Sequence, residues 1–318
     1  MSNNATPNIG SLSFASTESH CCWYCGRGEE TLPTKLQECE HCGLAEYCNL
    51  ECQRGDWKLH KVKCKNLTEI VVDKQVSKKV RSGSLKRRLL ALSEGTIILS
   101  IRDPYITTIG DMYLAFERIQ EAPFFECKSL LRVDLKGCTK LTSVGNGAFM
   151  RCTSLTSVVL PDILTQIGLA AFGECTSLTS VVFPDSLTQI GEQAFARCSS
   201  LLSVVLPDSL TQLGGGAFQQ CTSLTSMVLP DSLTQLGEGA FAGCTSLTSV
   251  VFPDSLKQVG EGAFAACPSL TSVVLPDSAV LGDDVFYLFD ECDALLQKAA
   301  LAGFDSLELY LRDRYKSI

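Results

Sequence analysis

The residues best suited to chemistry in this chain are eight potential metal ligands, grouped in four pairs between positions 22 and 64. The pairs are Cys22 and Cys25, Cys39 and Cys42, Cys48 and Cys52, and His60 and Cys64. A gap of two residues places both sulfur atoms of a tight turn on one ion, and a gap of three places both ligands on one face of a helix. Four pairs are enough for two tetrahedral sites, so we predict that this segment binds two Zn²⁺ ions.

Three accessory residues in register with these pairs, Tyr47, Gln53 and Trp57, make residues 22–64 resemble a MYND-type zinc finger. The resemblance implies interleaved ligands, with Cys22, Cys25, Cys48 and Cys52 on one ion and Cys39, Cys42, His60 and Cys64 on the other. A sequential order, the first four and then the last four, would also complete two tetrahedra, and spacing alone leaves it open. Because so short a segment buries little apolar surface, metal binding should supply most of its folding free energy, on the order of 10 kcal/mol per site.

The same resemblance implies a binding partner for the finger. Such fingers bind proline-containing peptides in an extended form, and the matching positions here are Gln53 and Trp57. The amphipathic indole ring of Trp57 suits such a contact, although a structural cover over a zinc site is an equally good interpretation.

The composition of the whole chain is that of a globular protein. It has 318 residues, 45% of them apolar, with no run of eighteen apolar residues and no export signal at the start. We therefore expect an intracellular protein, cytoplasmic or nuclear, in which the 17 cysteines are metal ligands and buried thiols rather than disulfides. The net charge of −8 is divided unevenly, because residues 1–103 sum to +3 and the remainder to −11.

An internal repeat occupies the second half of the chain, where six cysteines recur at a constant period of 23 residues: Cys152, Cys175, Cys198, Cys221, Cys244 and Cys267. A fixed period of this size is typical of a solenoid. Each unit resembles the leucine-rich repeat of the BspA-like class, over roughly residues 106–292. Within one unit, Leu178, Val181 and Phe183 are expected to point inward from a short strand, with Pro184 in the turn. Gly191 is expected to permit the turn into a helical segment around Ala194 and Phe195.

We therefore predict a small zinc-bound α+β finger followed by a leucine-rich-repeat solenoid of stacked short strands and turns, with a helical C-terminal cap. The predicted boundaries are a disordered N-terminus (1–20), the finger (21–65), a basic linker (66–95), an N-terminal cap region (96–126), the solenoid (127–292) and the helical cap (293–318). The repeated phenylalanines should form a buried ladder from Phe149 to Phe264, and the repeated cysteines should be small buried residues.

Polar residues also recur with the repeat. Serines such as Ser180 and valines such as Val182 should share the outward strand face, which suits an extended or repetitive ligand or none. Aspartates at the turn, Asp185 among them, should repel one another, so we expect each to bond to the turn backbone. The alternative is that the aspartates form a strip that binds calcium or a basic peptide.

Between the finger and the repeats, Lys74–Arg88 carries seven basic residues, which indicates either a nuclear-import signal or a solvated linker.

These features favour an adaptor that mediates protein–protein interactions and is not an enzyme. The only histidines are His20, His41 and His60, so no general base is available outside the finger. The alternative is an accessory module of a lysine methyltransferase or ubiquitin-transfer complex, with the activity in a partner. Nucleic-acid binding through Lys74–Arg88 is disfavoured by the overall acidity of the chain, and we expect no membrane association.

Overall fold

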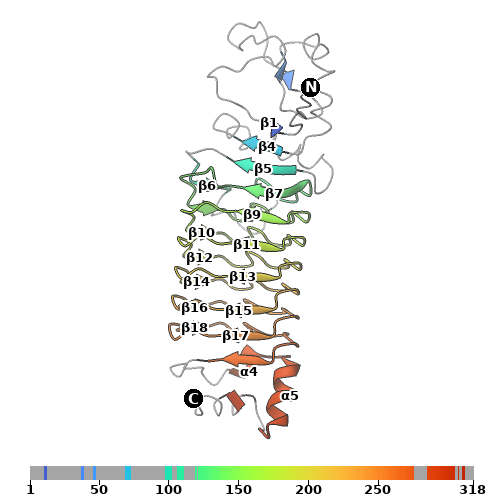
Figure 1. Cartoon of the computed structure of the whole chain (residues 1–318), viewed down its shortest axis with the longest axis vertical. Helices are drawn as coiled ribbons and strands as arrows, with labels where there is room; N and C mark the ends of the chain where they lie inside the picture. Colours follow the sequence, from blue (N-terminus) through green and yellow to red (C-terminus); the bar gives the residue numbers. More distant parts are fainter. Residues whose placement is uncertain are drawn as a thin grey trace, which may run out of the picture.

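The computed structural model of the chain is an elongated stack of coils, with the two sides of the stack formed by parallel strands (Figure 1). It describes residues 97–101, 106–110, 121–275 and 285–304, single residues at 119, 307, 310 and 311, and the backbone of short strands at 11–12, 37–38, 46–47 and 69–72. The finger ligands and Lys74–Arg88 lie outside the described residues.

Most coils contribute one strand to each of two sides. On the first side, a seven-stranded parallel sheet runs through β1 (Ser11–Leu12), β4 (Glu69–Val72), β5 (Ile97–Ile101), β7 (Leu130–Asp134), β9 (Ser157–Val159), β11 (Ser180–Val182) and β13 (Ser203–Val205). It is followed by a three-stranded sheet of β15 (Ser226–Val228), β17 (Ser249–Val251) and β19 (Ser272–Val274). Figure 1 shows these strands stacked one above another along the length of the molecule.

The second side is a continuous seven-stranded sheet of two-residue strands. Its members are β6 (Thr108–Ile109), β8 (Ser143–Val144), β10 (Gln166–Ile167), β12 (Gln189–Ile190), β14 (Gln212–Leu213), β16 (Gln235–Leu236) and β18 (Gln258–Val259). A separate antiparallel pair joins β2 (Gln37–Glu38) to β3 (Glu46–Tyr47).

The strands pair in the register that the repeat predicts. Ser180 lies opposite Ser203, and Gln189 lies opposite Gln212, so identical residues of neighbouring coils are adjacent. The first side loses its ladder between β13 and β15, although the Thr225 amide still donates 3.4 Å to the Leu202 carbonyl across the break. Threonines such as Thr179 and Thr248 also join neighbouring coils, because their hydroxyl groups donate to carbonyls of the preceding coil.

The core is a set of apolar ladders, as predicted. Seven successive rings from Phe124 to Phe264 stack with centroids 5.0–5.5 Å apart and planes within 11° of parallel. The repeated leucines at the positions of Leu178 and Leu187 are fully buried beside them, except Leu256, which is partly buried. Complete burial of each ring contributes about 2–3 kcal/mol, so the ladders account for most of the stability of the stack.

The segment after each glycine differs from expectation, because it is a series of turns and not a helix. The Phe195 amide donates 2.8 Å to the Ala217 carbonyl of the next coil, so the backbone bonds between coils. The left-handed conformation falls at Gln193 (φ 52°) and Arg197 (φ 60°), and not at Gly191. A Cβ added at Gly191 would lie 2.8 Å from the Gly168 carbonyl carbon, so this glycine is required by the close approach of neighbouring coils.

The C-terminal end of the stack is covered by helices, as predicted. Helix α4 (Val285–Leu288) leads into α5 (Asp293–Leu301), which Figure 1 shows at the end of the molecule opposite β1. Phe289, in the turn between them, stacks on Phe264 at 5.8 Å, and Leu295 of α5 is fully buried. The cap therefore continues the phenylalanine ladder by one ring and closes it.

Candidate functional site: the outward faces of the solenoid

The first outward face is built by alternation along the short strands. In β11, Val181 points into the core and is 6% exposed, whereas Val182 points outward. The outward valines of β11, β13 and β15 are 80%, 82% and 65% exposed (Val182, Val205 and Val228), and those of β17 and β19 are 38% and 46% exposed (Val251 and Val274). Because every coil has the same register, these side chains form a column along the molecule.

A column of aspartates follows at the turn after each strand. Asp162, Asp185, Asp208 and Asp231 are exposed, and none makes a hydrogen bond or ion pair within the described part of the chain. The expected bonds from these carboxylates to the turn backbone are therefore not formed. Instead the next residue stabilises the turn, since the Ser186 hydroxyl donates 2.7 Å to the Leu164 carbonyl of the preceding coil. The aspartates are left facing solvent.

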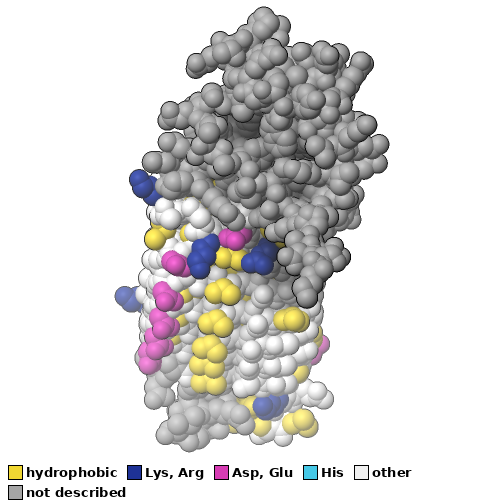
Figure 2. Space-filling model, turned by 45° about the horizontal axis from the view of Figure 1, so that its top comes forward, with side chains coloured by type: hydrophobic (Ala, Val, Ile, Leu, Met, Phe, Trp, Pro, Cys, Tyr) yellow, Lys and Arg dark blue, Asp and Glu magenta, His cyan; other side chains and the backbone are white. Residues whose placement is uncertain are grey.

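Figure 2 shows the resulting pattern, an acidic column beside a hydrophobic column on the same face of the stack. We name the outward valines of β11 to β19 together with Asp162, Asp185, Asp208 and Asp231 the valine–aspartate strip. Across the described ranges, no three histidine, cysteine, aspartate or glutamate side chains are grouped as metal ligands, so this strip does not have the geometry of a calcium site.

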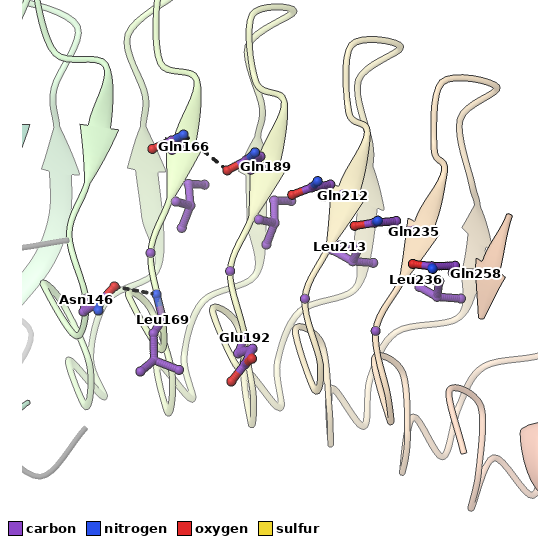
Figure 3. Close-up of a pocket in the computed structure, with 16 residues that line it drawn as sticks. Asn146, Gln166, Leu169, Gln189, Glu192, Gln212, Leu213, Gln235, Leu236 and Gln258 are labelled. Carbon is purple, nitrogen blue, oxygen red and sulfur yellow. Dashed lines mark hydrogen bonds between the residues drawn. The ribbon is translucent and has the colours of Figure 1, made fainter. Parts of the chain in front are cut away.

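The second side carries a polar groove that the sequence analysis did not single out. Figure 3 shows its glutamines in line, one per coil: Gln166, Gln189, Gln212, Gln235 and Gln258. The Gln166 side-chain amide donates 3.2 Å to the Gln189 side chain, and the open volume beside the row is about 600 Å³. The recurrence of glutamine every 23 residues could have predicted this row from the sequence.

The repeated cysteines are inert parts of the core, as predicted. Cys198 is fully buried, and its thiol donates 3.2 Å to the Phe172 carbonyl. Burial, which disfavours the charged thiolate, raises the pKa of Cys198 to about 12, and Cys244 shifts in the same way for the same reason. All nine described cysteines, Cys127 to Cys292, are free thiols. Burial is the main cause of the raised pKa in four of these thiols: Cys175, Cys198, Cys221 and Cys244. A raised pKa disfavours the thiolate, so these four are not activated nucleophiles.

The predicted finger residues are Cys22, Cys25, Cys39, Cys42, Cys48, Cys52, His60 and Cys64 for the metal, and Gln53 and Trp57 for a peptide. All ten lie outside the described residues, so their assignment stays a prediction. The donor chemistry of the eight ligands, seven thiols and one imidazole in pairs, is that of a structural zinc site.

Constant coil register, two sides of parallel strands and solvent-facing side-chain columns define a repeat solenoid of the kind that acts as an interaction module. A family model described as the BspA type leucine rich repeat region matches residues 112–224 and 165–295. Since these matches cover more than half of the 318 residues, the chain belongs to the BspA-type leucine-rich-repeat family. A second family model, the MYND finger, matches residues 22–64. The finger is thus a zinc-binding segment.

Curated relatives match the finger segment. N-lysine methyltransferase SMYD2-A of Danio rerio is 59% identical over 29 residues, which are 9% of this chain and 7% of the relative. SET domain-containing protein 14 of Caenorhabditis elegans is 54% identical over 35 residues, 11% of this chain and 8% of the relative. The chain therefore spans less than a tenth of the length of these proteins.

Solved structures match the solenoid. The leucine-rich-repeat protein TpLRR of T. pallidum is 31% identical with a TM-score of 0.46, and the match covers 55% of this chain and 84% of that one. A leucine-rich cell surface protein of Faecalibacterium prausnitzii is 21% identical with a TM-score of 0.34, covering 72% and 82% of the two chains. No helix among the described residues has the length and apolar character to cross a membrane.

Proposed function

We propose that this protein is an adaptor that holds one partner at its zinc finger and a second at its solenoid. The observation that carries the proposal is the column of solvent-facing valines from Val182 to Val274. Exposed aliphatic side chains in a contiguous row are uncommon on a protein surface that has no partner. Neither of the two matched family models describes an enzyme domain.

In this proposal the finger holds two Zn²⁺ ions in the interleaved order and binds proline-containing peptides through Gln53 and Trp57. Support comes from the MYND match over residues 22–64 and from the donor set within it. The zinc ions have a structural role, since they fix the segment that carries the peptide contacts. We also propose a cytoplasmic or nuclear location, with Lys74–Arg88 as a candidate import signal.

Affinity capture with the full chain and with the Trp57→Ala variant tests the adaptor proposal. Partners lost from the variant are assigned to the finger, and partners retained by it are assigned to the solenoid. We expect both groups. If the variant captures the same proteins as the unmodified chain, the peptide role of Trp57 is wrong, and if neither chain captures any protein, the adaptor proposal is wrong.

One observation favours an alternative, since relatives that match the finger include N-lysine methyltransferases. Under this alternative the chain is an accessory module, and a captured partner supplies lysine methyl transfer or ubiquitin transfer. Captured complexes should then modify added histone or ubiquitin substrates. Complexes that are inactive in both assays would eliminate the alternative while leaving the adaptor proposal intact.

A further inference from the structure

The valine–aspartate strip combines two properties that determine which kind of partner would fit it. Its apolar part is one valine wide and runs across at least five coils, from Val182 in β11 to Val274 in β19. Its charged part runs parallel to it, because each aspartate follows its outward valine by three residues. Figure 2 shows the two columns side by side along the axis of the stack.

The carboxylates of the strip have no counter-charge among the described residues. Among the described residues, Glu174 forms ion pairs with Arg151 and Arg197, in the turn segment beyond the second sheet. Asp185, Asp208 and Asp231 are left one coil apart in solvent, so like charges repel along the column. A partner with Lys or Arg side chains along this column would relieve that repulsion, whereas a neutral or acidic partner would not.

The spacing of the strip selects the conformation of the partner. Equivalent rings of neighbouring coils are 5.0–5.5 Å apart, and paired strands are about 4.8 Å apart. An α-helix lying along the column advances about 5.4 Å per turn, close to one turn per coil. In an extended peptide, side chains on one face repeat about every 6.7 Å, so they no longer lie opposite the valines after two coils.

A second copy of this chain is a poorer occupant. Placed face to face, two strips would bring aspartates opposite either aspartates or the uncharged Ser180 and Ser203 columns. Both arrangements leave every carboxylate without a counter-charge while the contact removes it from water. Charge complementarity therefore favours a basic partner over self-association.

We propose that the valine–aspartate strip binds an amphipathic α-helix of a partner protein, with the apolar face of the helix on the valines and a Lys- or Arg-rich flank on the aspartates. This inference rests on the adaptor function proposed above and names the partner class of the solenoid. A helix of 16 residues, about 24 Å long, would span four to five coils.

The test is a selection of 16-residue peptides from a randomised phage-displayed library on the full immobilised chain. We expect enriched sequences with apolar residues at i, i+3 or i+4, and i+7, and with Lys or Arg on one adjoining flank. Synthetic copies should bind about tenfold more weakly to the Val182→Asp/Val205→Asp variant, and raising the salt concentration should weaken binding to the unmodified chain. The isosteric Asp185→Asn/Asp208→Asn variant should reduce the preference for Lys over Glu on the flank.

The matched control is Leu301→Asp, which places an aspartate at an aliphatic side chain that is 84% exposed at the end of α5, away from the strip. It should bind the selected peptides like the unmodified chain, and all variants should show the same thermal unfolding. Peptides whose binding depends on Trp57 belong to the finger, and a final round of selection on the immobilised Trp57→Ala variant removes them, because only peptides that bind without Trp57 are retained. The inference is overturned if no basic amphipathic sequence is enriched, if the peptides bind the strip variants normally, or if light scattering shows a dimer that the valine substitutions dissociate. Any of these results would leave partner capture by the full chain, and so the adaptor proposal, standing.

Discussion

Single positions in this solenoid are constrained by contact with the equivalent residue of the neighbouring coil. The cysteine ladder illustrates this, because each thiol is buried and hydrogen-bonded to a phenylalanine carbonyl of the preceding coil, as Cys221 is to Phe195 at 3.3 Å. The identity of these residues as free, small core side chains could be predicted from their 23-residue period and from the lack of histidine in the repeats. The hydrogen-bond acceptors of these thiols could not be predicted from the sequence, because they depend on the geometry of the turns.

Because its thiols are buried, the solenoid should become less stable at alkaline pH. Burial raises the pKa of Cys198 from 9.0 to about 12, so the folded state holds this proton more tightly than the unfolded chain does. The stabilisation is complete below pH 9 and is lost as the pH rises from about 9 to about 12, at up to about 1.4 kcal/mol per pH unit for each such thiol. Urea unfolding at pH 7 to 11 measures it, and Cys198→Ala should reduce the slope. A free energy of unfolding that stays level above pH 9 would contradict the shift.

The structure predicts that alanine is tolerated less well at Gly191 than at a turn glycine with free space around it. Ala in place of Gly191 would put its Cβ 2.8 Å from Gly168 backbone, so we expect Gly191→Ala to cost about 1–3 kcal/mol of unfolding free energy. The control is Gly173→Ala, whose nearest contact is 3.4 Å and whose position is alanine in other coils, for example Ala196. Chemical denaturation of both variants measures the difference, and equal effects would show that coil contact does not require Gly191.

Whole strands and turns follow the repeat wherever the residue pattern is uninterrupted. The alternation of Val181 and Val182, and the proline turn after Phe183, were sufficient to predict the first strand of each coil and its inward residues. The turn segment was predicted as helical because Ala194 and Phe195 suit a helix, but its amides bond to the next coil, a long-range effect that local propensity does not contain. The loss of the ladder between β13 and β15 could not be predicted, because the outward residues of both strands follow the repeat.

Introducing threonine at position 202 should strengthen the contact with the preceding coil. In Leu202→Thr the new hydroxyl can donate to the Thr179 carbonyl, as Thr248 donates to Thr225 at 2.9 Å. We expect a gain of about 0.5–1.5 kcal/mol in unfolding free energy, and slower hydrogen exchange at the amide of residue 202, which bonds to the Thr179 carbonyl at 3.2 Å. Thr179→Leu, the reverse exchange one coil earlier, should have the opposite effect. An unchanged unfolding free energy in both variants would show that this hydroxyl does not stabilise the contact between coils.

The molecule as a whole combines a segment that depends on metal with a stack that depends on packing. Chelation by EDTA should therefore unfold residues 22–64 and leave the solenoid folded, because no metal-ligand cluster occurs among the residues described in the stack. Limited proteolysis with mass spectrometry should show new cleavages between Cys22 and Cys64 only, and a colorimetric assay should find two zinc ions released per chain. One ion per chain would contradict the two-site prediction, and cleavage within residues 121–275 would contradict the independence of the stack.

Because each coil contacts mainly its two neighbours, the solenoid should tolerate the loss of one complete coil. Deletion of residues 198–220 joins Arg197 directly to Cys221 and removes one full period, so every ladder closes in register. We expect a folded protein with the same strand signal per residue in circular dichroism and a lower midpoint of urea unfolding, since one set of coil contacts is lost. Deletion of residues 198–209 is the control. It removes about half a period and joins Arg197 to Leu210, a leucine from the opposite side of the coil, so the ladders fall out of register and folding should fail. Equal unfolding midpoints for the two deletions would show that register along the chain does not determine this fold.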